Sequence, residues 1–287
     1  LAQLFQNSYD PAQPILPYYD GELTETAKVP ASQIYGLVVS DLTEAIELLD
    51  GYVRTDKSKI DKTVAQGLLA NVYAGMGNFT EAKVMADAVI ASGYPLTTAG
   101  ALAYPGAGSG FNDVNSPSWI WAFDLTEELG HQLIDWWGQM DPFTYSYAWA
   151  GDHKSIDDAL FAQIDDSDVR KGQFGTGTAP LQAINKFFDP NRQIGGQYII
   201  TTDLIFMRVE EFYLLSAESA ARTGNEAAAK ATMIEMLDNR MPNAASTVNA
   251  LSGAALQEFI YLQTRIELWG EGKTYYAMKR NQATVNS

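Results

Sequence analysis

Aromatic side chains that could hold a ligand are concentrated in residues 136–149. Six aromatic residues alternate there with small polar groups, and Pro142 interrupts any helix because proline fixes φ and lacks an amide donor. An aromatic face can cover the C–H face of a sugar ring, while nearby polar groups hydrogen-bond its hydroxyls. We therefore predict a glycan-binding surface, with burial of the same rings in a local core as the alternative. The predicted ligand-binding residues are Trp136, Trp137, Asp141, Tyr145, Tyr147 and Trp149.

Signals for catalysis or metal binding are weaker. Adjacent carboxylates at 127–128 and at 210–211 would point in different directions on a helix, so neither pair can flank a glycosidic bond. We expect these four glutamates to be solvated or to cap helices. The acidic stretch 165–168 resembles part of a calcium loop but lacks the glycine and final glutamate of an EF-hand. His131 and His153 do not form a zinc motif. No catalytic residue and no cofactor is expected, with calcium as the one candidate ion.

The charge balance argues against a nucleic-acid partner. The 287 residues include 19 Lys+Arg and 35 Asp+Glu, for a formal net charge of −16, which opposes binding to a phosphate backbone. The absence of cysteine excludes disulfides and thiolate chemistry. No run approaches the roughly 20 apolar residues of a membrane-spanning helix. Because the sequence opens at Leu1 and stops soon after a predicted helix, we expect a fragment of a longer protein.

Helical hairpins are the predicted scaffold. Apolar residues spaced three and four apart predict a helix over 33–49, with Ser32 as its N-cap. The spacing of Tyr73, Gly77 and Ala82 matches a tetratricopeptide unit, in which glycine permits the turn and alanine permits close helix crossing. Such units must stack to bury their apolar faces. The predicted hairpins span 61–93, 206–239 and 254–280.

The middle of the chain has a different character. Residues 94–205 contain Pro- and Gly-rich loops, including a glycine-rich turn at 104–110, possible strands at 119–123 and 198–201, and short helices near 155–164. We expect Trp119 and Trp121 to be core residues. A long irregular insertion in a helical scaffold is usually functional. The expected organisation is one domain over 1–287, with 31–93 and 206–280 as scaffold and 94–205 as the ligand-binding insertion.

Three segments, taken in their order and spacing, resemble motifs of the SusD/RagB family. The first is residues 31–45, ASQIYGLVVSDLTEA, followed by a hairpin over 65–91. The second is residues 207–218, MRVEEFYLLSAE, and the third is residues 265–273, RIELWGEGK, leading to 278–280. Departures occur at Gln263, Thr264 and Ala277, where the family usually or often has charged residues. Because these are scaffold motifs, the departures concern local salt links and not the choice of ligand.

The resemblance implies a mainly α fold, a SusD-like superhelix of tetratricopeptide-like hairpins with a loop-rich insertion and a few short strands. It also implies a cell-surface lipoprotein of the outer membrane in Bacteroidota, anchored by a lipid on an N-terminal region that this sequence lacks. Such a protein would deliver oligosaccharides, or in some members peptides, to a SusC-like TonB-dependent transporter. No ligand-binding residue can be transferred by position, because the family has no fixed binding motif.

The function that we predict is therefore non-enzymatic glycan binding in a nutrient-uptake system. One alternative is a tetratricopeptide-type scaffold that binds a peptide or protein partner through its acidic surface. A second is a glycoside hydrolase whose acid and base come from separate loops. Neither the particular glycan nor the oligomeric state follows from the sequence.

Overall fold

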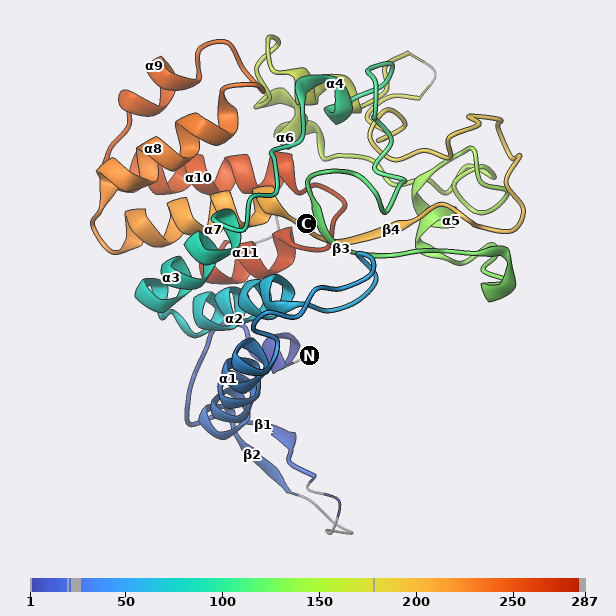
Figure 1. Cartoon of the computed structure of the whole chain (residues 1–287). Helices are drawn as coiled ribbons and strands as arrows, with labels where there is room; N and C mark the ends of the chain where they lie inside the picture. Colours follow the sequence, from blue (N-terminus) through green and yellow to red (C-terminus); the bar gives the residue numbers. More distant parts are fainter. Residues whose placement is uncertain (1, 20, 22–26, 178, 284–287) are drawn as a thin grey trace.

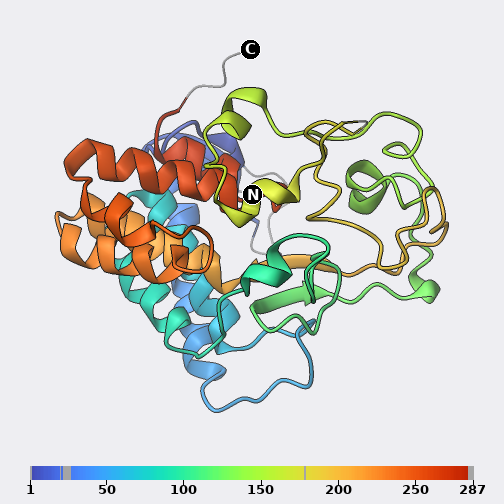
Figure 2. The same ribbon diagram turned by 90° about the horizontal axis from the view of Figure 1, so that it is seen from above.

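Helices make up the scaffold of the computed structural model, which describes residues 2–19, 21, 27–177 and 179–283. The other residues of the domain expected over 1–287 lie outside the described residues. Figures 1 and 2 show stacked helices on one side of the molecule and a loop-rich part on the other, which confirms the predicted fold class. The scaffold helices are α1 (Ala31–Leu48), α2 (Lys62–Met76), α3 (Phe79–Ile90), α7 (Val209–Arg222), α8 (Glu226–Leu237), α9 (Ala244–Asn249), α10 (Gly253–Glu267) and α11 (Thr274–Arg280).

Local signals account for the first helical hairpin, α2 with α3. Asp61 caps α2 by accepting a hydrogen bond from the Val64 amide at 3.0 Å. Gly77 ends the helix with φ of +79°, a conformation that glycine adopts readily. Ala82 is fully buried where α3 packs on its neighbours, as the tetratricopeptide spacing predicts. The N-cap predicted for α1 is wrong, because the helix begins at Ala31 with Pro30 as its N-cap and Ser32 lies inside the first turn.

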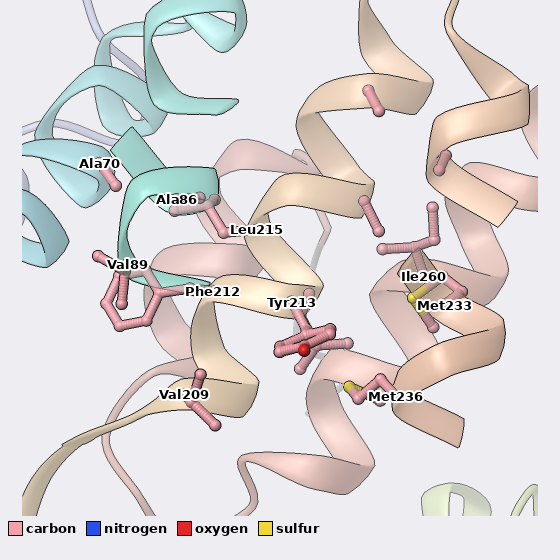
Figure 3. Close-up of a cluster of buried hydrophobic side chains, with 14 of the residues drawn as sticks. Ala70, Ala86, Val89, Val209, Phe212, Tyr213, Leu215, Met233, Met236 and Ile260 are labelled. Carbon is pink, nitrogen blue, oxygen red and sulfur yellow. The ribbon is translucent and has the colours of Figure 1, made fainter. Parts of the chain in front are cut away.

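Helix α7 is the centre of the hydrophobic core. All of its residues from Val209 through Ala221 are buried, since the helix packs against α3 on one side and α8 and α10 on the other. Figure 3 shows Phe212 beside Val89 of α3, while Tyr213 lies near Met236 of α8. Helix α2 also approaches closely, since a Cβ on Gly67 would lie 2.6 Å from Cζ of Phe212.

Short elements organise residues 94–205. Strand β3 (Trp119–Phe123) pairs in antiparallel fashion with β4 (Leu204–Arg208), and it is confirmed at its predicted position. The strand predicted at 198–201 is wrong, and the helix predicted from 206 starts only at Val209 because β4 occupies those residues. Trp119 is buried, whereas Trp121 is half-buried against Phe206. The short helices are α4 (Ala99–Leu102), α5 (Trp136–Met140), α6 (Asp158–Ala162) and the 3₁₀ turns Glu127–Leu129 and Val169–Gln173.

The N-terminal segment contains short regular elements. A 3₁₀ turn, Ala2–Phe5, is followed by β1 (Pro14–Pro17), which pairs with β2 (Lys28–Pro30) next to α1. Ile15 of β1 packs in a small buried cluster with Tyr35 of α1. None of the helices in the described ranges is long and apolar enough to cross a membrane.

A buried ion-pair network joins the insertion to the scaffold. Glu267, at the end of α10, accepts hydrogen bonds from Arg170 (3.0 Å), Arg208 (2.8 Å) and Arg240 (3.0 and 3.3 Å). The Glu267 side chain is fully buried. The three arginine partners hold its pKa well below the usual range and outweigh the burial that would raise it. Arg170 comes from the insertion, whereas Arg208 comes from β4, Arg240 from the turn after α8 and Glu267 from α10.

Further pairs complete the network. Glu271 binds Lys186 and Arg208 at 2.8 Å, and Glu210 binds Arg208 and Arg240 at 2.9 Å. Four cations thus face four carboxylates: Arg170, Lys186, Arg208 and Arg240 against Asp168, Glu210, Glu267 and Glu271. The prediction that the glutamates at 210–211 are solvated or capping charges is wrong. Both are buried and ion-paired, Glu211 with Lys273, because partners distant in sequence reach them.

Candidate ligand-binding surface

Three aromatic rings form an exposed surface on the loops of the insertion. Tyr145, Trp149 and Tyr198 are 39%, 43% and 56% exposed. The ring of Tyr145 lies 4.6 Å from that of Trp149 and 5.6 Å from that of Tyr198, centroid to centroid. Tyr147, which is 47% exposed, lies on the same loop. We call Tyr145, Trp149 and Tyr198 the aromatic platform. Contiguous exposed rings of this kind offer amphipathic contact area to a ligand.

The main chain fixes the platform from two loops. The amide of Tyr145 donates to the carbonyl of Gln197 at 2.9 Å, and the amide of Gly195 donates to the carbonyl of Pro142 at 3.0 Å. The indole of Trp149 packs directly on Gly195, since a Cβ at this position would lie 2.6 Å from the indole nitrogen. Its φ of +63° disfavours other residues independently. The two loops therefore form one unit that carries all three rings.

Asp141 is fully buried and organises the loop that carries Tyr145. One carboxylate oxygen accepts from the Phe143 amide at 2.8 Å, and the other accepts from the Thr144 hydroxyl at 3.0 Å and the Asp189 amide at 3.2 Å. Asp189 in turn accepts from the Gln197 side chain at 2.7 Å. Burial raises the pKa of Asp141 to about 7 despite the hydrogen bonds, which lower it.

The raised pKa predicts a characteristic pH dependence of stability. A carboxyl whose pKa is higher in the folded state stabilises the fold fully below its unfolded pKa and loses this contribution as the pH rises through the folded value. For Asp141 the window runs from pH 3.8 to about 7. We expect the stability advantage of the wild type over Asp141→Asn to shrink as the pH rises through this window. Urea unfolding of both proteins from pH 4 to 8 measures it, and a constant or growing advantage would contradict the assignment.

The six residues predicted from the sequence fall into two groups. Tyr145, Tyr147 and Trp149 are exposed, as a ligand-binding role requires. Trp137 and Asp141 are fully buried, which leaves them no surface for direct contact and makes their role structural. Trp137 donates its indole N–H to the carbonyl of Asp203 at 3.3 Å. Trp136 is half-buried, edge-on to Trp137 and Phe187.

Tyr198 was not predicted as a ligand-binding residue. Its neighbours Ile199 and Ile200 favour a strand, and the glycines at 195 and 196 are the signal that a loop continues here. Because the partners of Tyr198 lie about 50 residues earlier in the chain, its place in the platform depends on tertiary contacts.

The candidate calcium loop has its carboxylates engaged separately. Asp165 accepts from the amide and hydroxyl of Ser167, Asp166 pairs with Lys171, and Asp168 pairs with Arg170. Within the described ranges, no group of three or more acidic or histidine side chains could hold a metal ion. His131 contacts Asp135 and His153 contacts Gln182, in separate places.

The fold and the platform define a class, helical-hairpin proteins that carry an exposed aromatic surface on an insertion. Residues 162–286 match the model of the SusD family. The chain also superposes on a SusD-like carbohydrate binding protein from Bacteroides vulgatus, with a TM-score of 0.76 and 26% identity over 99% of this chain and 61% of that one. The family model covers less than half of the chain, and together the two matches show that the chain has a SusD-like fold.

Two further solved structures agree. A putative sugar binding protein from Bacteroides vulgatus gives a TM-score of 0.70 at 25% identity, covering 96% of this chain and 60% of that one. A SusD superfamily protein from Bacteroides thetaiotaomicron gives 0.72 at 22% identity, with 95% and 61% covered, and shows the fold alone. No curated protein sequence matched the chain. The chain thus spans about three fifths of the length of these relatives.

Proposed function

We propose that this protein captures an oligosaccharide on the aromatic platform and does not cleave it. The observation that carries the proposal is the set of three contiguous, exposed rings held on a braced pair of loops. Pyranose rings present C–H faces that pack on aromatic side chains, and their hydroxyls hydrogen-bond to polar groups at the rim. Two of the similar structures, a SusD-like carbohydrate binding protein and a putative sugar binding protein, support a sugar as the ligand class.

The two buried carboxylates of the platform loops, Asp141 and Asp189, are not placed for hydrolysis. A glycoside hydrolase needs two carboxyl groups on either side of the scissile bond, both reaching the substrate. Asp141 and Asp189 are 0% and 2% exposed and accept hydrogen bonds from main-chain amides of the platform loops. Neither carboxylate is accessible to a substrate, so the two side chains hold the loops that carry the rings and do not serve as acid and base.

The wider role that we propose is based on the similarity to SusD-like proteins. The full-length protein is a lipid-anchored component of the outer membrane, exposed at the cell surface, and it delivers the captured glycan to a SusC-like TonB-dependent transporter. The helical scaffold would provide the contact with the transporter, and the insertion would provide the ligand site. A peptide in place of the glycan is the competing ligand.

The test compares exposed rings inside and outside the platform. A glycan array on the purified protein first selects an oligosaccharide, whose affinity is then measured by calorimetry. We expect Tyr198→Ala and Trp149→Ala each to weaken binding by about 1–3 kcal/mol, by analogy with aromatic hot spots. Tyr52→Ala is the matched control, because Tyr52 is 49% exposed on the loop after α1, outside the platform.

Several outcomes would contradict the proposal. Equal losses in Tyr52→Ala and Tyr198→Ala would show that the platform is not the site. Binding to a peptide array with no glycan hit would favour the peptide scaffold. Release of product from the selected oligosaccharide would favour the hydrolase.

A further inference from the structure

A cavity of about 460 Å³ lies apart from the aromatic platform. It is enclosed by residues 95–98, helix α4 with the glycine-rich loop 107–109, and the segment 111–119 that leads into β3. None of the platform residues lines it. Small-molecule sites in proteins have volumes of roughly 300–1,000 Å³. The cavity is therefore large enough to hold a ligand of its own.

The walls of this cavity are fixed by the surrounding structure. The amide of Thr97 donates to Glu210 at 2.5 Å, and its carbonyl accepts from Arg240 at 3.1 Å, so this wall is attached to the buried ion-pair network. The Thr97 hydroxyl donates to Ser118 on the opposite segment at 2.8 Å. The glycine-rich loop packs directly on α4, since a Cβ at Gly106 would lie 2.0 Å from the Gly100 carbonyl oxygen. A ligand would thus meet a preformed site.

The chemistry of the lining is that of a site for a neutral, hydroxyl-rich ring. Apolar surface comes from Leu96, Ala101 and Phe111. No lysine or arginine is among the lining residues. Lys57, the nearby cation, already donates to the Ser116 carbonyl and is balanced by Asp113, so the site has no free positive charge for an anionic ligand. One oxygen of Asp113 accepts from the main-chain and side-chain amides of Asn115, and the residue is exposed, so its carboxylate is accessible to a ligand hydroxyl. The polar lining groups are Thr98, Ser109, Asn112, Asp113, Asn115 and Ser116.

We propose that this cavity is a second binding site, which takes one uncharged sugar ring. The proposal rests on glycan capture as the proposed function, and it adds a concave site for a single ring to the aromatic platform. Asn112 connects the two regions, because its side chain donates to the carbonyl of Phe188 at 2.8 Å, one residue before the Asp189 that braces the platform loops. Hydrogen bonds therefore connect the two sites within residues 94–205.

Saturation-transfer NMR with single sugars tests the cavity. The cavity variants and their control are made in the Tyr198→Ala background, so that binding by the platform contributes less to the signal. The probes are methyl β-glucoside, methyl β-galactoside and glucuronic acid. We expect one or both neutral glycosides, and not the acid, to receive transfer from the wild type and from Tyr198→Ala. Two variants alter the cavity. Ala107→Trp places an indole at an exposed lining position, where it would fill the cavity, and Asp113→Ala removes a polar lining group. In each, the apparent affinity for the neutral glycoside should fall at least about tenfold, or 1.4 kcal/mol. Ala255→Trp, at an exposed position of α10, is the matched control.

The controls separate failure of this proposal from failure of the proposed function. Thermal melting first verifies that each variant folds. If Ala107→Trp does not fold, the result for Asp113→Ala alone tests the cavity site. No transfer to any neutral sugar, or transfer unchanged in both cavity variants, would overturn the cavity site while leaving oligosaccharide binding by the platform intact. Loss of oligosaccharide binding in the Tyr198→Ala protein, measured on the same samples, reports on the platform alone.

Discussion

Replacing Glu267 with glutamine is expected to lower the free energy of unfolding by about 3–5 kcal/mol, the usual cost of leaving buried charges without a partner. Glu267 balances parts of three arginine charges, and its side chain has no access to solvent. A neutral amide would accept fewer hydrogen bonds and would direct an N–H toward at least one guanidinium. The change should also weaken the attachment of Arg170, and with it the attachment of the insertion to the scaffold.

Urea unfolding at constant pH measures this effect. Glu128→Gln is a suitable control, since it makes the same change at an exposed position. The control should unfold like the wild type. A loss of under about 1 kcal/mol in Glu267→Gln, the range of an ordinary surface ion pair, would mean that the buried network contributes little.

Trp137→Ala is expected to be the most destabilising change among the aromatic residues of 136–149. Its indole is fully buried, packs edge-on against Trp136 and Phe187, and donates a hydrogen bond to the Asp203 carbonyl. Truncating a buried tryptophan costs about 3–5 kcal/mol through lost burial and the cavity left behind. Trp149→Ala makes the same substitution at a ring that is 43% exposed, so its main effect should fall on ligand binding.

The comparison needs two measurements on each variant, the midpoint of thermal unfolding and the affinity for the selected oligosaccharide. Trp137→Ala should lower the midpoint strongly, whereas Trp149→Ala should lower the affinity with little change in the midpoint. The reverse pattern would mean that Trp137 meets the ligand directly and that the assignment of roles by burial is mistaken.

The scaffold could be predicted from sequence because its signals are local. Asp61 at the start of α2, Gly77 at its end and the inward alanines of α3 each act within a few residues. The boundary at β4 was missed because its apolar residues continue without a turn signal into α7. Strand pairing with β3, more than 80 residues earlier, decides that Leu204–Arg208 is extended.

The site could be predicted only in part, for a related reason. Composition indicates where aromatic residues gather, but not which rings face outward. Trp137 and Trp149 both lie among aromatic and small polar residues in the sequence. Trp137 is buried because Phe187 and Asp203, from distant segments, pack on it and accept its hydrogen bond. Tyr198 and the buried partners of Glu210 were missed in the same way. Contacts across tens of residues determine these features.

The seat of Trp149 on Gly195 has a consequence for how this surface could be diversified. The indole packs against the main chain at Gly195, where a side chain would collide with it, so few other residues are tolerated at position 195. The outer rings at 145, 147 and 198 are largely exposed. A randomised library confined to those three codons should therefore yield folded proteins with altered sugar preferences, whereas one that includes codon 195 should lose most of its members to misplaced indoles.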